Sequence, residues 1–192
     1  MADRIKRVIA GVAAFFTGEK IVINKEGIIS ILPHRGRMLL LDEIVITDNK
    51  VMGKFEVTEE VCQGHKFNDQ LVFRGVDIIE MAAQVLGVWL AQHPESEGKI
   101  AFFRRLLGEV KFFGMVVPSD VLMIEIPVSK ESEKAGEDYM GSPRIEISGR
   151  PDRLIEKAVA ENIIARVDKK LKASISGIEL SIVRIVPKIE LS

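Results

Sequence analysis

The sequence predicts an α+β fold in which a curved antiparallel sheet wraps around one long central helix, and two observations carry this prediction. Residues 75–92 are apolar around nearly the whole circumference of a helix and hold no proline, which is typical of a helix buried on most sides. After residue 99, runs rich in β-branched residues alternate with turn signals, which is typical of antiparallel strands. A buried helix and such strands pack together best when the sheet covers the helix.

Length and composition limit the possible classes of protein. The chain has 192 residues, which is enough for one well-buried domain and marginal for two. Its 27 Lys and Arg residues nearly balance 28 Asp and Glu residues, and a net charge of −1 argues against nucleic-acid binding. The 47% apolar content excludes a disordered chain. The single cysteine, Cys62, allows no intrachain disulfide, which fits a reducing compartment such as the cytoplasm.

Residues 1–27 are predicted to be an N-terminal extension of a single domain over residues 28–192. No apolar run reaches the length of a membrane-spanning helix, so we expect no membrane span. Ile5, Val8 and Val12 recur at helical spacing, which indicates a short amphipathic helix. Packing on the protein itself is favoured over contact with an interface or partner, and over export, since no small-residue cleavage site follows.

The remaining elements follow from local patterns. Residues 38–57 are predicted to form a β-hairpin around the turn signal at 48–50. Residues 62–74 are polar and irregular, which indicates a long loop, and long loops inside a compact domain are often functional. Further strands are expected at residues 100–107, 109–117, 121–128, 144–148, 157–167 and 178–186.

The central helix carries one polar stripe. Asp77, Glu80 and Gln84 are spaced i, i+3 and i+7, so their side chains share one narrow face of the helix. A polar stripe on a helix that is buried on most sides needs a reason, and it marks these three residues as candidates for a site.

Four segments of the chain match one family in order and in spacing. They are LPHRGRMLLLDEI (32–44), QGH (63–65), RGVDIIEMAAQ (74–84) and GEVKFFGMVVPSD (108–120). Together they resemble the β-hydroxyacyl-[acyl-carrier-protein] dehydratases of fatty-acid synthesis, and they cover roughly residues 32–130. This resemblance implies the hotdog fold, in which a curved antiparallel sheet wraps around one long central helix.

The resemblance also implies a catalytic histidine before the central helix and a carboxylate on that helix, completed across a homodimer interface. His65 and Glu80 occupy these positions. Glutamate at the second position resembles the branch of the family that dehydrates without isomerising the double bond. Gln84 occupies the position that helps to orient the carboxylate.

The chemistry of dehydration explains why these residue types are suitable. A 3-hydroxyacyl thioester loses water when a base takes the α-proton and an acid protonates the departing hydroxyl. The imidazole of His65 suits the first task and a carboxyl among apolar side chains, Glu80, suits the second. The unsatisfied N–H groups of Gly75 and Val76 at the helix start suit the thioester oxygen. This chemistry needs no metal and no organic cofactor.

The loop before the helix departs from the family pattern. GHKFNDQLVFRG (64–75) has none of the three prolines of the family, and one residue is inserted between His65 and Glu80. Because proline stiffens a loop, the histidine is expected to be less firmly held. Arg74 replaces the proline before the helix and Asp77 replaces an apolar residue. Either residue is expected to retune the acid–base pair or to bind a group of the substrate.

Three other side chains have plainer interpretations. His34 lies in the first matched segment, where the family uses it to organise the fold. His93 is interpreted as a helix-end residue close to free carbonyl groups. Cys62 has no evident activator and is interpreted as a small packed side chain near the site.

The sequence therefore predicts an enzyme that dehydrates a 3-hydroxyacyl thioester, carried on acyl carrier protein or coenzyme A, in fatty-acid or related lipid synthesis. Two alternatives stay open, namely hydrolysis of acyl thioesters by the same fold and a noncatalytic subunit that binds acyl chains or supports a partner. The expected assembly is a homodimer or a higher homo-oligomer. Candidate cations for docking an acidic carrier protein are Lys66, Arg74, Lys99, Arg104 and Arg105.

Overall fold

The computed structural model describes residues 20–92, 99–128, 144–148 and 155–184. The helices are α2 (Lys25–Ile31), α3 (Glu59–Cys62) and α4 (Gly75–Leu90), with a 3₁₀ turn, η1, at Gly36–Met38. The strands are β1 (Ile21–Asn24), β2 (Glu43–Ile46), β3 (Lys50–Glu56), β4 (Lys66–Phe67), β5 (Gln70–Leu71), β6 (Lys99–Leu106), β7 (Val110–Phe112), β8 (Val121–Pro127), β9 (Arg144–Ser148), β10 (Ile155–Val167) and β11 (Lys170–Arg184).

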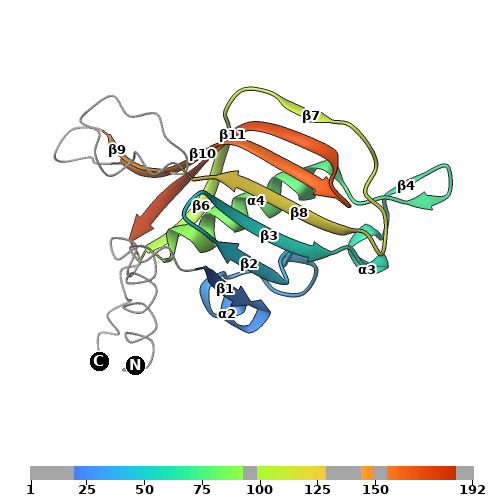
Figure 1. Cartoon of the computed structure of the whole chain (residues 1–192), viewed down its shortest axis with the longest axis horizontal. Coiled ribbons are helices and arrows are strands. Elements are labelled where there is room, and N and C mark those ends of the chain that lie inside the picture. The colour runs from blue at the N-terminus through green and yellow to red at the C-terminus, as the bar shows by residue number, and fades with distance from the viewer. Residues whose placement is uncertain (1–19, 93–98, 129–143, 149–154, 185–192) are drawn as a thin grey trace, which may run out of the picture.

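One antiparallel sheet dominates the molecule. Its strands follow the order β1-β2-β3-β8-β10-β11-β6, with β7 paired to β11 and β9 paired to β10. Figure 1 shows α4 running along the strands of this sheet, which agrees with its contacts to β3, β8, β10 and β11. The predicted arrangement, a sheet covering one long helix, is therefore present.

The core lies between α4 and the sheet. Met81, Val85 and Leu86 on the helix are completely buried, and the inward side chains of β8 and β11 are also buried. Gly53 on β3 lies so close to α4 that a Cβ at this position would collide with Val85 and Leu41. A glycine is therefore needed where helix and strand approach one another most closely.

The sheet begins earlier in the chain than the sequence analysis expects. Residues 21–24 form β1, which pairs antiparallel with β2, and α2 follows at once with Asn24 as its N-cap. The Asn24 side chain accepts a hydrogen bond from the backbone of Gly27 at 3.0 Å. Residues 21–27, assigned to the extension on sequence grounds, thus belong to the sheet and its first helix. The amphipathic helix expected further upstream and the helix-end residue His93 lie outside the described residues.

Most predicted elements are present with changed boundaries. The predicted helix 75–92 is α4, and the predicted hairpin 38–57 is β2–β3, although residues 36–38 form a 3₁₀ turn rather than the start of a strand. The strand expected over 109–117 is short, since pairing of β7 with β11 covers Val110 to Phe112 alone. Within the described ranges, no helix has both the length and the apolar character needed to cross a membrane.

The predicted irregular loop 62–74 is largely structured. Its centre is a two-stranded hairpin, β4–β5, in which Lys66 pairs with Leu71 and Phe67 pairs with Gln70. The two turn residues, Asn68 and Asp69, have φ values of 46° and 62°. Asn and Asp tolerate this left-handed conformation better than most residues, and two such residues in succession give a turn that suits the twist of a hairpin.

Candidate active site

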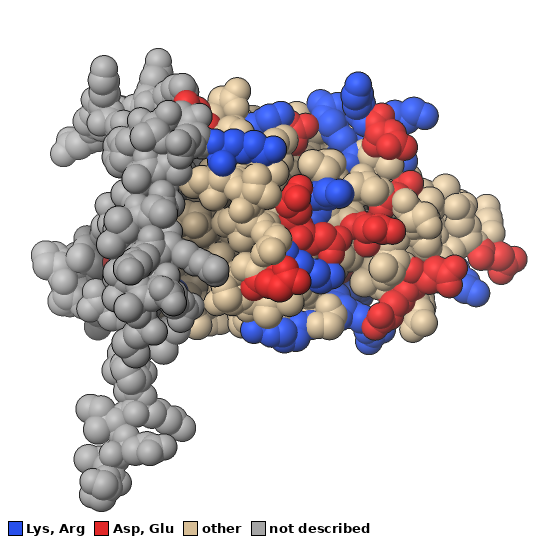
Figure 2. Space-filling model, turned by 60° about the horizontal axis from the view of Figure 1, so that its bottom comes forward, with Lys and Arg blue, Asp and Glu red and all other residues tan. Residues whose placement is uncertain are grey.

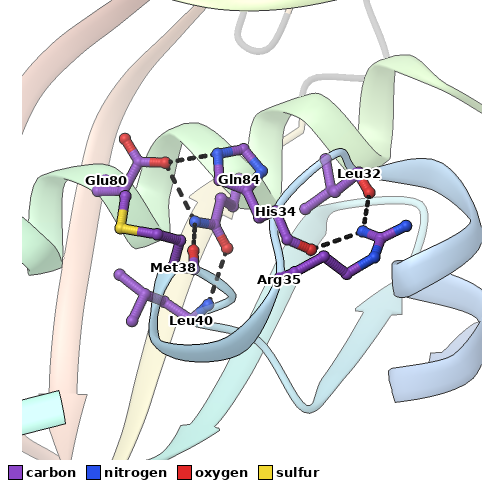
Figure 3. Close-up of polar contacts among 7 residues, drawn as sticks. All are labelled: Leu32, His34, Arg35, Met38, Leu40, Glu80 and Gln84. Carbon is purple, nitrogen blue, oxygen red and sulfur yellow. Dashed lines mark hydrogen bonds and ion pairs between the residues drawn. The ribbon is translucent and has the colours of Figure 1, made fainter.

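Glu80 and Gln84 lie one turn apart on the same face of α4, as their spacing predicts. The Gln84 side chain is buried and donates through Nε2 to Glu80 Oε1 at 3.1 Å and to the carbonyl oxygen of Met38 at 2.7 Å. Its Oε1 accepts from the backbone N–H of Leu40 at 3.0 Å. As Figure 3 shows, one amide thus fastens the segment 38–40 to the helix and holds one oxygen of the Glu80 carboxyl.

His34 approaches the same carboxyl from the loop after α2. Its Nε2 lies 3.1 Å from Glu80 Oε1, and the two side chains are similarly shielded, with 27% and 28% of their surface exposed. The family resemblance implies that His34 organises the fold, and it does not predict this contact. A histidine close behind α2 and a glutamate on α4 are far apart in sequence, so no local pattern connects them.

Arg35 fixes the loop that carries His34. Its guanidinium donates to the carbonyl oxygens of Leu32 and His34, both at 2.6 Å, and to that of Ile29 at 2.9 Å. Figure 3 shows the first two of these bonds beside the Glu80 cluster. An arginine satisfied by three backbone carbonyls holds the chain in one path, and so the imidazole is presented to α4 from a fixed backbone.

His65 lies away from this cluster, at the base of the β4–β5 hairpin. Its ring Nδ1 is 2.9 Å from the carbonyl oxygen of Val72, and its own carbonyl accepts from the Val72 N–H at 3.0 Å. A carbonyl oxygen can only accept, so the proton of the neutral ring resides on Nδ1 and Nε2 keeps its lone pair. Within the described part of a single chain, no hydrogen bond or ion pair joins His65 to Glu80.

The start of α4 brings the other predicted residues together. Arg74 is the residue before the first helical position, and its Nε and Nη2 both donate to the Asp77 carboxylate at 2.7 Å. Gly75 and Val76 begin the helix, where the first N–H groups have no intrahelical acceptor. The ring of Phe112 lies against Gly75 so closely that a Cβ there would meet it at 2.7 Å.

Arg74 and Asp77 therefore satisfy each other's charge, and Asp77 also influences Cys62. The hydrogen bond and charge of Asp77 raise the pKa of the Arg74 guanidinium. Burial raises the pKa of the Cys62 thiol, and the nearby Asp77 carboxylate raises it further. Cys62 is thus kept as a thiol, which agrees with a packed side chain rather than a nucleophile.

The candidate docking cations are largely engaged in ion pairs. Arg104 and Arg105 contact the two oxygens of the buried Glu179 carboxylate at 3.2 and 3.1 Å, and Lys99 contacts Glu156 at 2.6 Å. On the face shown in Figure 2, acidic and basic side chains are interspersed. Among the described residues, no group of three or more His, Cys, Asp or Glu side chains could hold a metal ion.

A family model and two similar proteins indicate the same family for this chain. Residues 32–148 match the model of the FabA-like domain. A 3-hydroxyacyl-[acyl-carrier-protein] dehydratase FabZ of Enterococcus faecalis is 41% identical over 124 residues, which cover 62% of this chain and 84% of that protein. A FabZ dehydratase of Roseiflexus castenholzii is 37% identical over 113 residues, or 57% and 78% of the two chains.

A solved structure, the dehydratase heterocomplex ApeI:P from Xenorhabdus doucetiae, superimposes with a TM-score of 0.52 at 18% identity, covering 83% of this chain and 91% of the other. At that level of identity the likeness concerns the fold, and it agrees with the predicted hotdog architecture. The family match spans more than half of the sequence, and the relatives are covered over most of their length. On this evidence the chain, with its sheet wrapped around α4, belongs to the family of proteins with a FabA-like domain.

Proposed function

We propose that this protein is a 3-hydroxyacyl-[acyl-carrier-protein] dehydratase, which converts a 3-hydroxyacyl thioester into the trans-2-enoyl thioester during fatty-acid or related lipid synthesis. The observation that carries the proposal is the Glu80 carboxyl, held on the buried helix α4 by Gln84. The relatives named 3-hydroxyacyl-[acyl-carrier-protein] dehydratase FabZ are similar to the chain over the region that contains α4, which supports the proposal.

In the proposed reaction, His65 and Glu80 divide the work of acid and base. The Nε2 lone pair of His65 takes the α-proton while its Nδ1–H stays bonded to Val72. The electrons of the broken C–H bond form the new double bond, and the C–O bond to the hydroxyl breaks. Glu80 supplies the proton that turns the departing hydroxyl into water, and the N–H groups of Gly75 and Val76 receive charge on the thioester oxygen.

A second copy of the chain is proposed to bring His65 to Glu80, because no hydrogen bond or ion pair joins the two in the described part of one chain. Strand β6 ends the order of the large sheet and exposes Phe102 and Phe103, by 55% and 45%. Phe112 and Phe113 on the neighbouring segment are also exposed. An apolar strand at the end of a sheet is poorly suited to water and well suited to pairing, which supports a homodimer.

The acyl carrier is proposed to dock near Arg104 and Arg105. Both guanidinium groups share the single carboxylate of Glu179, so this cluster keeps one unit of excess positive charge. An acidic carrier protein would be attracted to that charge. Lys66 and Arg74 remain candidates near the site, although Arg74 is already paired with Asp77. We assign the reaction to the cytoplasm, which suits a chain with one unpaired cysteine.

Hydration of a crotonyl thioester, and its reverse, tests the proposal with wild-type protein, His65→Ala and Glu80→Gln on carrier-protein and coenzyme A substrates. Wild-type turnover and a loss of roughly 100-fold or more in either variant, with unchanged circular dichroism, are expected for an acid–base pair. Release of free thiol without enoyl product would support hydrolysis instead. No turnover by wild-type protein on chains of several lengths would overturn the proposal in favour of a noncatalytic subunit.

A further inference from the structure

The Glu80 carboxyl is held asymmetrically. Oε1 lies 3.1 Å from Gln84 Nε2 and 3.1 Å from His34 Nε2, so two groups from different elements contact the same oxygen. Within the residues that the structure describes, Oε2 has no hydrogen bond or ion pair, and Figure 3 shows this oxygen pointing away from both partners. One oxygen is therefore used for anchoring, and the other is left for a substrate.

The surroundings of His34 identify its tautomer. Its Nδ1 is buried and has no hydrogen-bond partner among the described residues. A buried N–H without an acceptor is rarer and less tolerable than a buried acceptor without a donor. The ring proton is therefore assigned to Nε2, which faces Glu80 Oε1 at 3.1 Å.

A donor in this position acts differently on the two forms of Glu80. Hydrogen bonds to a charged carboxylate are shorter and roughly twice as strong as bonds between neutral groups. The attraction between His34 Nε2 and Glu80 Oε1, which lie 3.1 Å apart, therefore grows as Glu80 releases its proton. An interaction that is stronger in the transition state than in the bound substrate raises kcat and leaves KM nearly unchanged.

We infer that His34 is a positioning residue for the dehydration, which directs Glu80 Oε2 towards the substrate and stabilises the carboxylate that forms as the hydroxyl departs. This inference rests on the proposed function. His34 is not expected to touch the substrate carbons. It acts through Glu80, from a loop that Arg35 fixes by bonds to three backbone carbonyls.

Two amide substitutions separate the donor from the bulk of the side chain. His34→Gln places an N–H donor close to the position of Nε2, whereas His34→Asn places one near Nδ1, too short to reach Glu80. In dehydration of the 3-hydroxybutyryl thioester, the reverse of crotonyl hydration, His34→Asn is expected to lower kcat about 10- to 100-fold, the range for loss of a hydrogen bond to a charged group, with KM within about twofold. His34→Gln is expected to restore most of this loss.

A second experiment detects the contact between His34 and Glu80 directly, without an activity assay. Nitrogen-15 NMR of the imidazole is expected to show His34 protonated on Nε2, with its signals shifted in Glu80→Gln. Equal kcat in wild type and His34→Asn, or a ring protonated on Nδ1, would overturn the inference while leaving the dehydratase proposal intact. Absence of wild-type turnover would instead overturn the proposed function, and the positioning role of His34 with it, even if the NMR signals showed the contact.

Discussion

Gln84 is the residue on which the arrangement of the site depends most, because one buried amide satisfies the backbone of Met38 and Leu40 as well as Glu80. Gln84→Leu keeps the size of the side chain but orphans both backbone groups. Each unsatisfied buried group costs about 1–3 kcal/mol, so the free energy of unfolding, measured by urea denaturation, should fall by that order. Gln92→Leu is the matched control, because this amide donates to a single carbonyl at the end of the helix. Equal losses in both variants would contradict the role assigned to Gln84.

Cys62 gives a prediction about pH at the same scale. Burial and the Asp77 carboxylate raise the pKa of its thiol above the ordinary 9.0. When the pKa of a group is higher in the folded than in the unfolded protein, the protein gains stability at pH values below the unfolded-state pKa. This stability is lost as the pH rises from the unfolded-state pKa through the folded-state pKa. The stability difference between wild type and Cys62→Ala should therefore shrink between pH 7 and pH 10. A difference that stays constant across this range, measured in denaturation curves at each pH, would contradict the raised pKa.

At the scale of elements, the start of α4 uses an ion pair where the family has a proline and an apolar residue. Arg74 has φ of −70° and ψ of 139°, values that proline adopts readily. Arg74→Pro alone is expected to destabilise the protein, because Asp77 is 8% exposed and would lose its partner. The cost should be about 1–3 kcal/mol, less than for a fully buried pair because the Arg74 side chain is half exposed.

The double variant Arg74→Pro/Asp77→Leu should recover most of this stability, because it removes the uncompensated charge and restores the pattern of the family. Thermal unfolding of wild type, both single variants and the double variant provides the cycle. Additive effects of the two substitutions would show that the pair is not coupled.

The elements also show which features local sequence patterns can predict. The apolar surface of α4, interrupted by one polar stripe, and the alternation of the later strands are sufficient to predict the helix and most of the sheet. Asn68 and Asp69 were interpreted as part of an irregular loop, although both favour the left-handed turn that closes β4–β5. The pairing of Ile21 with Ile46, and the contact of His34 with Glu80, depend on chain paths that no short window of sequence specifies.

At the scale of the whole molecule, the proposed site needs two chains, and mixing inactive variants tests this directly. His65→Ala and Glu80→Gln protein are each expected to be inactive alone. After joint refolding, a mixed dimer contains one site with both groups intact. Random pairing in a two-fold symmetric dimer then restores about one quarter of wild-type activity. If mixing restores no activity while mass spectrometry detects mixed dimers, the two groups do not combine across the interface.

The hairpin β4–β5 before α4 allows its own sequence to change between related proteins without moving the ring of His65. The N–H of Val72 donates to the carbonyl oxygen of His65, and the carbonyl oxygen of Val72 bonds to Nδ1 of the His65 ring. The histidine is therefore anchored at the base of the hairpin. Residues 66–71 form an excursion beyond this closure. Their number and identity can therefore drift between species without displacing the imidazole, and the residue inserted here relative to the family is one such change. A variable tip on a fixed base thus lets the sequence of the hairpin change while the His65 ring keeps its bond to Val72.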